Sequence, residues 1–167
     1  STGYSVSPTG NITFAGQLAF PATQSASADA NTLDDYEEGA WTPVLTFSTP
    51  GNLSVTYSAQ TGQYTKVGRK VTLTMRVDTS TFTHTTASGT MTLTGIPFAP
   101  AATTVGDLNW GGITKAGYTQ INFQIAGAAT SATLSGCGSG VAIANVMVAD
   151  APTTSTINLR ASITYDV

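Results

Sequence analysis

Apolar and polar residues alternate with a period of two along several stretches of this chain. Residues 71–78 (VTLTMRVD) and residues 157–165 (INLRASITY) show the pattern most clearly. Side chains on a β-strand point alternately to opposite faces, so the alternation predicts strands with one buried and one solvated face. No stretch keeps apolar residues at the i, i+3, i+4, i+7 spacing of an amphipathic helix. The sequence therefore predicts an all-β protein.

The expected strands are separated by turns that contain Gly or Pro, such as Pro50-Gly51 and Gly111-Gly112. The expected ranges are residues 43–48, 53–58, 62–67, 69–79, 89–95, 103–108, 118–127, 130–135, 140–148 and 155–165. Many short strands at this spacing are typical of an antiparallel β-sandwich, here a jelly-roll-like one. Residues 141–148 (VAIANVMV) are apolar on both faces, which indicates a central strand or one that lies against a neighbouring subunit.

Charge is scarce in this sequence, and its scarcity excludes several classes of partner. Charged residues make up 9% of the 167 residues, whereas soluble proteins average roughly 25%. With six basic residues and a net charge of −3, the chain lacks the basic surface that nucleic-acid binding needs. No apolar run approaches the roughly 18 residues of a membrane span, so no membrane insertion is expected. A single cysteine, Cys137, excludes an internal disulfide.

The first 40 residues differ from the rest in composition. They are rich in Ser, Thr, Ala and Gly, with one weak strand expected at residues 12–15. Such a segment has too few large apolar residues to order itself alone, so we expect it to lie against other chains or to be partly disordered. The domains expected are a stalk over residues 1–40 and a sandwich over residues 41–167. The absence of an initial Met suggests that the chain is a fragment of a longer protein.

Four of the nine acidic residues lie close together, at Asp34, Asp35, Glu37 and Glu38. A glycosidase needs two facing carboxylates about 5–9 Å apart, but we expect these four in a linker that holds no fixed geometry. We therefore assign no catalytic residue and do not expect an enzyme. Calcium binding by the same residues, with Asp29 and Asn31, stays open, although the spacing matches no known calcium loop. The simpler interpretation is that the carboxylates are solvated or pair with Lys66, Arg69 or Lys70.

Carbohydrate binding is the chemistry best supported by the residues. Aromatic rings stack on the apolar faces of sugars while nearby polar groups bind the hydroxyls. The segment Asp107 to Tyr118 (DLNWGGITKAGY) offers this combination in a Gly-rich loop. The candidate glycan-binding residues are Trp110, Tyr118, Asp107, Asn109 and Lys115. Trp110 has an alternative interpretation as a core residue or a contact on a trimer axis.

Several other residues have structural interpretations. Trp41, before Thr42-Pro43, is expected to anchor the stalk to the core. Tyr57 and Tyr64 are expected to pack across strands on either side of a turn at residues 60–62. His84, the single histidine, is expected in a solvated Thr-rich loop, and Cys137 is expected to fill space in a tight turn.

Residues 20–45 (FPATQSASADANTLDDYEEGAWTPVL) resemble a signature of the C-terminal domains of bacteriophage tail fibres and tailspikes. Residues 64–77 (YTKVGRKVTLTMRV) and 89–98 (GTMTLTGIPF) resemble the strand pair that follows it. The resemblance covers residues 20–98. It implies a homotrimer on a virion tail, joined to upstream fibre or tailspike domains, that recognises the host surface. It also implies that any depolymerase activity belongs to an upstream domain.

Together these observations predict a trimeric adhesion module that binds bacterial surface polysaccharide and also stabilises the trimer. The module would lie at the tip of the virion's tail fibre or tailspike and act extracellularly at the host cell surface, without a cofactor. Two alternatives remain at this point. One is a purely structural trimerisation cap that binds no ligand, and the other, less favoured, is a carbohydrate-active enzyme domain.

Overall fold

The structure is a computed structural model that describes residues 4–6, 8–10, 12–21, 23, 29, 32–33 and 35–167. In this part of the chain the fold is all-β, as predicted, and the helical content is one 3-10 turn, η1 (Val148–Asp150). The strands are β1 (Tyr4–Val6), β2 (Ile12–Phe14), β3 (Tyr36–Trp41), β4 (Val44–Thr49), β5 (Ser54–Val67), β6 (Lys70–Thr83), β7 (Ser88–Thr94), β8 (Thr104–Gly111), β9 (Gln120–Ile125), β10 (Ser131–Cys137), β11 (Ala144–Asn145) and β12 (Asn158–Asp166). Within the described residues, no helical segment has the length and apolarity of a transmembrane span.

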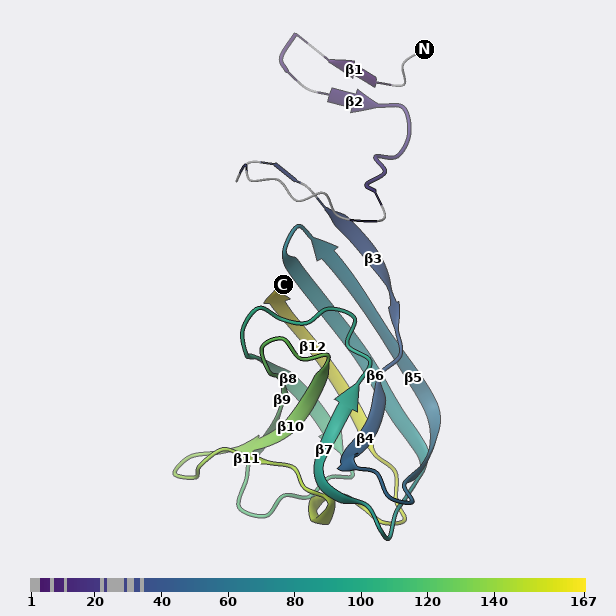
Figure 1. Cartoon of the computed structure of the whole chain (residues 1–167), viewed down its shortest axis with the longest axis vertical. Helices are drawn as coiled ribbons and strands as arrows, with labels where there is room; N and C mark the ends of the chain where they lie inside the picture. The colour runs from purple at the N-terminus through teal and green to yellow at the C-terminus, as the bar shows by residue number, and fades with distance from the viewer. Residues whose placement is uncertain are drawn as a thin grey trace.

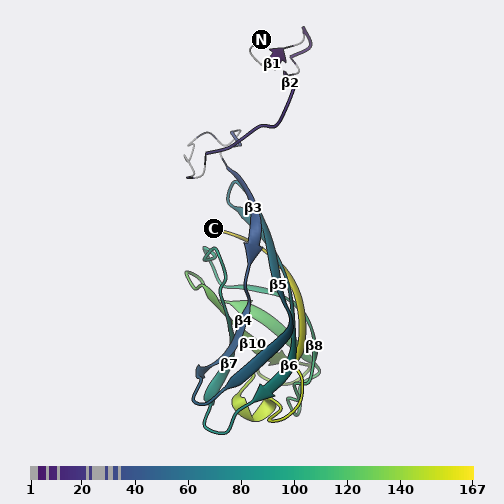
Figure 2. The same ribbon diagram turned by 90° about the vertical axis from the view of Figure 1, so that its right-hand side faces the viewer.

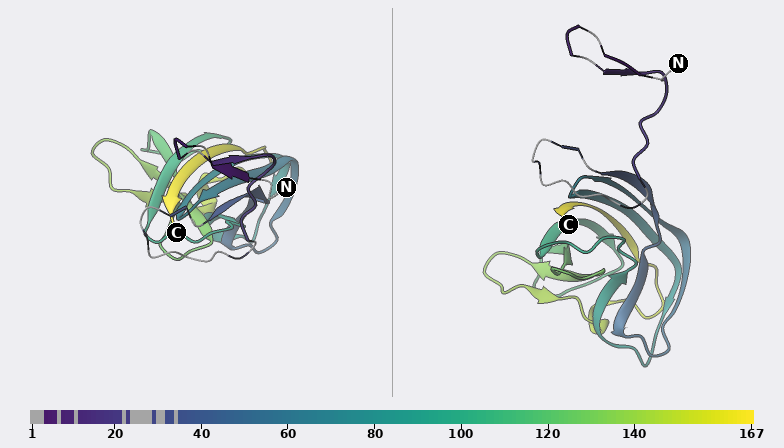
Figure 3. Two further views of the ribbon diagram at one scale, coloured as in Figure 1. Left: turned by 90° about the horizontal axis from the view of Figure 1, so that it is seen from above. Right: turned by 45° about the horizontal axis from the view of Figure 1, so that its top comes forward.

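The strands form one large antiparallel sheet and one small hairpin (Figure 1). The hairpin joins β1 to β2, and the weak strand expected at residues 12–15 is β2. In the large sheet the strand order is β3-β5-β6-β12-β8-β9-β10-β7-β4, with β11 added to β10. The sheet curls so that β4, β7 and β10 lie across the core from β5, β6 and β12 (Figures 1 and 3). The result is the sandwich-like antiparallel fold that the alternation predicts.

The core fills the inside of the curled sheet. Every second residue of β6 from Val71 to Val77 is buried there, and so are Leu159 and Ile163 of β12. Phe47, Phe82 and Phe123 are the largest of the fully buried side chains. The hydroxyl and amide residues between them face outward, which explains how a sheet with so few charges keeps a hydrated outer face.

The two edges of the sheet are consecutive strands of the chain. β3 and β4 lie at opposite ends of the strand order, and only Thr42-Pro43 separates them (Figure 2). Side chains of β5 close the gap, because Tyr57 Oη accepts a hydrogen bond from the Leu45 N–H (2.9 Å) and Gln60 Nε2 donates to the Pro43 carbonyl (2.9 Å). Trp41 is buried beside this crossing, and its role in anchoring the stalk to the core stays a prediction.

Two strand predictions are wrong. The turn expected at residues 60–62 does not exist, because β5 runs unbroken from Ser54 to Val67 with register shifts near Tyr57. Gly62 serves a different purpose there, since a Cβ at this position would lie 2.5 Å from Trp41 Cε2. The glycine makes room for the indole rather than bending the chain.

Residues 140–148 do not form a central strand. Only β11, two residues long, pairs with β10, and it lies off the main strand path. Val146 is fully buried, whereas Val141, Ile143 and Met147 are exposed, Ile143 by 72%. The apolar residues of this segment therefore cover little of this subunit's own core, and their place against a neighbouring subunit stays a prediction.

Candidate ligand-binding site

The predicted glycan-binding residues fall into two groups on opposite faces of the sheet. β8 extends to Gly111, so Asn109 and Trp110 lie on a strand and not in the Gly-rich loop that the sequence suggests. Trp110 follows Leu108 on the inner face, whereas Asp107 and Asn109 are exposed on the outer face. A single small ligand therefore cannot contact Trp110 and these two polar residues together.

Trp110, Lys115 and Tyr118 do meet, in a hollow of about 190 Å³ that Ile113 and Ile121 also line. Lys115 Nζ lies 2.9 Å from Asp150 Oδ2 and 5.2 Å from the centre of the Tyr118 ring. Tyr118 Oη donates to the Ala142 carbonyl at 3.0 Å. Both polar groups thus hold loops in place, and the hollow is smaller than most ligand pockets, which measure about 300–1,000 Å³.

Asp107 belongs to a polar row that crosses the outer face of the sheet. Strand register places one polar residue from each of six neighbouring strands side by side, in the order Gln63, Thr74, Ser162, Asp107, Asn122 and Ser135. Asn109 lies in the adjacent row, opposite Arg160. These rows are polar and contain no aromatic ring. The longer row is exposed from Gln63 to Asp107 and ends at the buried Ser135.

The acidic cluster is organised by β3, and the expectation that it lies in a linker is wrong for Glu37 and Glu38. Both lie on β3, paired with β5. Glu37 Oε1 accepts a hydrogen bond of 2.5 Å from Tyr64 Oη, and this bond raises the pKa of the tyrosine. Glu38 Oε2 accepts one of 2.8 Å from Tyr36 Oη. Neither carboxylate faces the other as a glycosidase pair would.

Asp35 forms a buried ion pair with Lys66, so this pairing prediction is confirmed, although the pair is buried and not solvated. The predicted participants Asn31 and Asp34 lie outside the described residues. Among the residues that are described, no group of three or more His, Cys, Asp or Glu side chains is placed to hold a metal ion.

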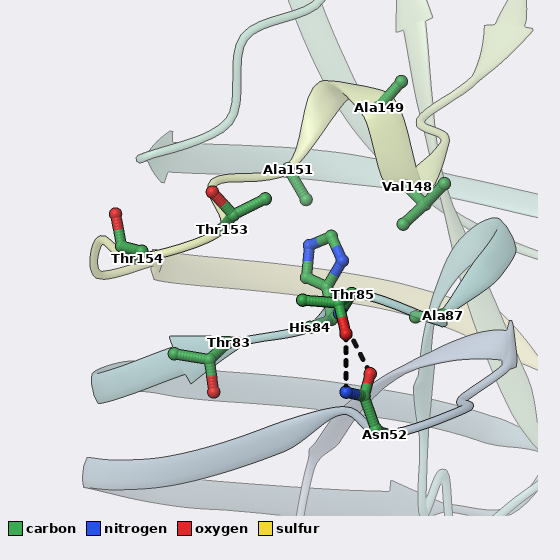
Figure 4. A pocket seen from close by; sticks show the side chains of 10 residues that line it. All are labelled: Asn52, Thr83, His84, Thr85, Ala87, Val148, Ala149, Ala151, Thr153 and Thr154. Carbon is green, nitrogen blue, oxygen red and sulfur yellow. Dashed lines mark hydrogen bonds between the residues drawn. The ribbon is translucent and has the colours of Figure 1, made fainter.

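A larger cavity, of about 800 Å³, is seen from close by in Figure 4. The segments that line it lie at the end of the sheet opposite the N-terminal strands (Figure 1). Three segments build it: the turn after β4, the connection from β6 to β7, and the stretch from η1 towards β12. The lining residues are Asn52, Thr83, His84, Thr85, Ala87, Val148, Ala149, Ala151, Thr153 and Thr154. We call this the His84 cavity.

His84 lies at the centre of this cavity, and the expectation of a solvated loop residue is wrong. Its side chain is 7% exposed and points towards the segment Val148 to Thr154 (Figure 4). The imidazole meets Phe47 and Phe82 edge-on, with ring centroids 5.1 and 5.7 Å away. Nε2 is buried without a hydrogen-bond partner among the described residues. The Thr-rich sequence around His84 gave no sign of the two phenylalanines that bury it.

Asn52 fixes the rim of the His84 cavity (Figure 4). Its Oδ1 accepts hydrogen bonds from the backbone N–H groups of Thr85 and Thr86, both at 2.9 Å, and its Nδ2 donates to Thr85 Oγ1 at 2.7 Å. Gly51 lets the turn approach, because a Cβ there would lie 2.5 Å from the Thr86 carbonyl oxygen. The rim is therefore preorganised by side-chain to backbone bonds between two distant segments.

The cavity combines methyl groups, hydroxyls and one imidazole. Among its lining residues none is a Lys, Arg, Asp or Glu. Such a surface suits an uncharged ligand with both apolar and hydroxyl-bearing parts.

Neither a protein-family model nor a curated protein matches the sequence. Among solved structures, the crystal structure of the Dettilon tailspike protein (gp208) is similar to the chain, with a TM-score of 0.52 and 18% sequence identity. The similarity covers 76% of this chain and 23% of that protein, so the chain corresponds to less than a quarter of the tailspike's length. What the two share is a fold, and the fold of this chain is tailspike-like.

Proposed function

We propose that the chain is a distal module of a bacteriophage tail fibre or tailspike, which adheres to bacterial surface polysaccharide as a homotrimer. The fold similarity to part of the Dettilon tailspike carries this proposal. The resemblance of residues 20–98 to tail-fibre sequences supports it. The module would sit on the virion tail, and upstream domains would supply any polysaccharide-cleaving activity.

Exposed apolar side chains support the trimer. In the N-terminal segment Ile12, Phe14 and Leu18 are each exposed by 46% or more, and Ile143 protrudes from the connection between β10 and β11. Large apolar residues at such exposure are expected to be covered by a partner, and three copies of one chain would cover them symmetrically.

Two surfaces support glycan binding at the predicted residues. The hollow of Trp110, Lys115 and Tyr118 offers an aromatic contact, and the outer polar row offers Asp107 beside Asn122 and Ser162. Each surface buries little ligand, so one site would bind weakly. Three copies on a repetitive polysaccharide would restore tight attachment through effective concentration.

The direct test is binding of the purified chain to an array of bacterial surface polysaccharides, with its mass in solution measured by light scattering. The proposal expects a trimer that retains at least one polysaccharide. Loss of this binding in Trp110→Ala would locate the site at the hollow, and loss in Asp107→Ala would locate it on the outer row.

A stable trimer that retains no polysaccharide would favour the second candidate, a purely structural trimerisation cap, which the exposed apolar residues also fit. Release of reducing ends by the chain alone would contradict both.

A further inference from the structure

We infer that the His84 cavity is a saccharide-binding site that takes an uncharged sugar residue with a methyl-bearing substituent, such as an N-acetyl group. The inference rests on the proposed adhesive function and adds a site that the sequence does not indicate. It places recognition at the end of the module opposite the N-terminal strands, away from the outer polar row. The Trp110 hollow is a neighbour of this site, because its Lys115 pairs with Asp150, which lies between the lining residues Ala149 and Ala151.

The unpaired imidazole nitrogen is the first reason. Buried polar atoms in proteins nearly always have a hydrogen-bond partner. A buried polar atom without a partner in its own chain is therefore expected to bond to a ligand or to water. His84 Nε2 is such an atom, on a residue that is 7% exposed and whose imidazole lies among the side chains that line the cavity (Figure 4). A neutral imidazole nitrogen accepts or donates one hydrogen bond, which matches a sugar hydroxyl or an amide.

The lining of the cavity gives the class of ligand. Ala87, Val148, Ala149 and Ala151 present methyl groups, and Thr83, Thr153 and Thr154 contribute hydroxyls. Because no Lys or Arg lines the cavity, a carboxylated or phosphorylated sugar would lose its hydration without gaining a counter-charge. A neutral residue with a methyl-bearing group matches both parts of the lining.

The frame of the cavity supports a binding role. The bonds from Asn52 to Thr85 and Thr86 join the turn after β4 to the connection after β6, so one wall is set before a ligand arrives. The amide of Asn52 is thereby occupied and is a positioning group, not a ligand contact. The volume of about 800 Å³ lies within the usual range for small-molecule sites and leaves space for neighbouring sugars of a polysaccharide chain.

The single histidine makes a direct experiment possible. The imidazole signals of His84 can be followed by NMR without ambiguity while N-acetylglucosamine, glucose or N-acetylneuraminic acid is added to the intact chain. We expect saturable shifts with N-acetylglucosamine, smaller ones with glucose, and none with the charged sugar. The indole N–H signal of Trp41, a core residue, serves as the internal control, and that of Trp110 reports binding at the Trp110 hollow. Shifts at Trp110 without shifts at His84 would overturn the inference while leaving the proposed function intact.

Two variants test the site, so that the result does not depend on a single substitution that could unfold the protein. His84→Phe keeps the ring between Phe47 and Phe82 but removes the nitrogen, and we expect polysaccharide binding to weaken about tenfold, the effect of one lost hydrogen bond. Ala151→Leu should weaken binding by filling the cavity, because the Ala151 methyl group points towards the imidazole (Figure 4). Ala126→Leu, at an exposed alanine that does not line the cavity, is the matched control and should bind normally.

The outcomes separate the two proposals. If the wild-type chain binds polysaccharide and both cavity variants bind it equally well, the His84 inference is wrong and adhesion occurs elsewhere. If the wild-type chain binds no polysaccharide on the array and none of the three sugars shifts His84, both the adhesive function and the inference fail.

Discussion

At the scale of single residues, Asp78 shows how this nearly uncharged protein uses the few charges that it has. Its carboxylate is 8% exposed and accepts hydrogen bonds from Arg76 Nε at 2.7 Å and from both terminal nitrogens of Arg160 at 2.8 and 3.0 Å. Burial alone would raise the pKa of Asp78, but the hydrogen bonds from the two arginines outweigh it and lower the pKa below its usual value.

This lowered pKa predicts a loss of stability in acid. Because the folded state binds the proton more weakly than the unfolded state, the contribution of Asp78 is complete above the unfolded pKa of about 3.9 and is lost as the pH falls through the lower, folded value. Asp78→Asn should lower the free energy of unfolding at pH 7 by about 1–2 kcal/mol, since the arginines are partly exposed. It should also flatten the decline of stability below pH 4, as denaturant titrations across pH would show. An unchanged pH profile would mean that other carboxylates cause the acid sensitivity.

His84 leads to a second residue-scale prediction, in which a substitution keeps or raises the stability of the fold. His84→Phe removes a buried nitrogen that has no partner among the described residues and retains both aromatic contacts, so the melting temperature should stay the same or rise by a few degrees. Thermal denaturation at equal protein concentration measures this. A marked fall in melting temperature would show that the imidazole makes a stabilising contact, and the binding-site interpretation would lose its main support.

At the scale of elements, β3 is attached to β5 by the packing of Trp41 on Gly62. Gly62→Ala would place a Cβ 2.5 Å from Trp41 Nε1 and Cε2, which forces the indole out of its place. We expect a loss of about 1–3 kcal/mol of stability and a change in tryptophan fluorescence. Gly111→Ala on β8 is the matched control, because its added Cβ would meet nothing closer than 3.8 Å. Equal stabilities for the two variants would show that the sheet edge adjusts at no cost.

The elements that the sequence predicts well are those with one buried face. β7, β9 and β12 alternate along their length, as β6 does from Lys70 to Val77, and the structure places them near their expected ranges, although β6 continues to Thr83. β3 escapes prediction because it is an edge strand on which only Trp41 is fully buried, so YEEGAW shows no apolar alternation. The His84 cavity could not be predicted either, because it forms where three segments distant in sequence come together, and no local sequence pattern indicates that contact.

At the scale of the whole molecule, the position of β3 decides which N-terminal deletion tests the predicted trimerising stalk. Removing residues 1–40 would delete most of β3 together with the segment before it, whereas removing residues 1–34 keeps β3 and the Asp35–Lys66 pair. We expect the shorter deletion to leave a folded sheet with a weaker trimer, and the longer one to destabilise the sheet itself. Light scattering and thermal denaturation of both forms separate the effects. A trimer unchanged by the shorter deletion would place the interface on the sandwich.

The crossing from β3 to β4 has a mechanical consequence for a module attached at one end and bound at the other. Tension between the N-terminal segment and a ligand held near η1 would pull β3 along its own axis (Figure 2). The six residue pairs between β3 and β5 would then be loaded in shear, all together, instead of opening one after another as in unzipping. Thr42-Pro43 passes the same load directly to the opposite edge of the sheet. A particle held by this module would thus apply force to both edge strands of the sheet at once, because only two residues connect β3 to β4.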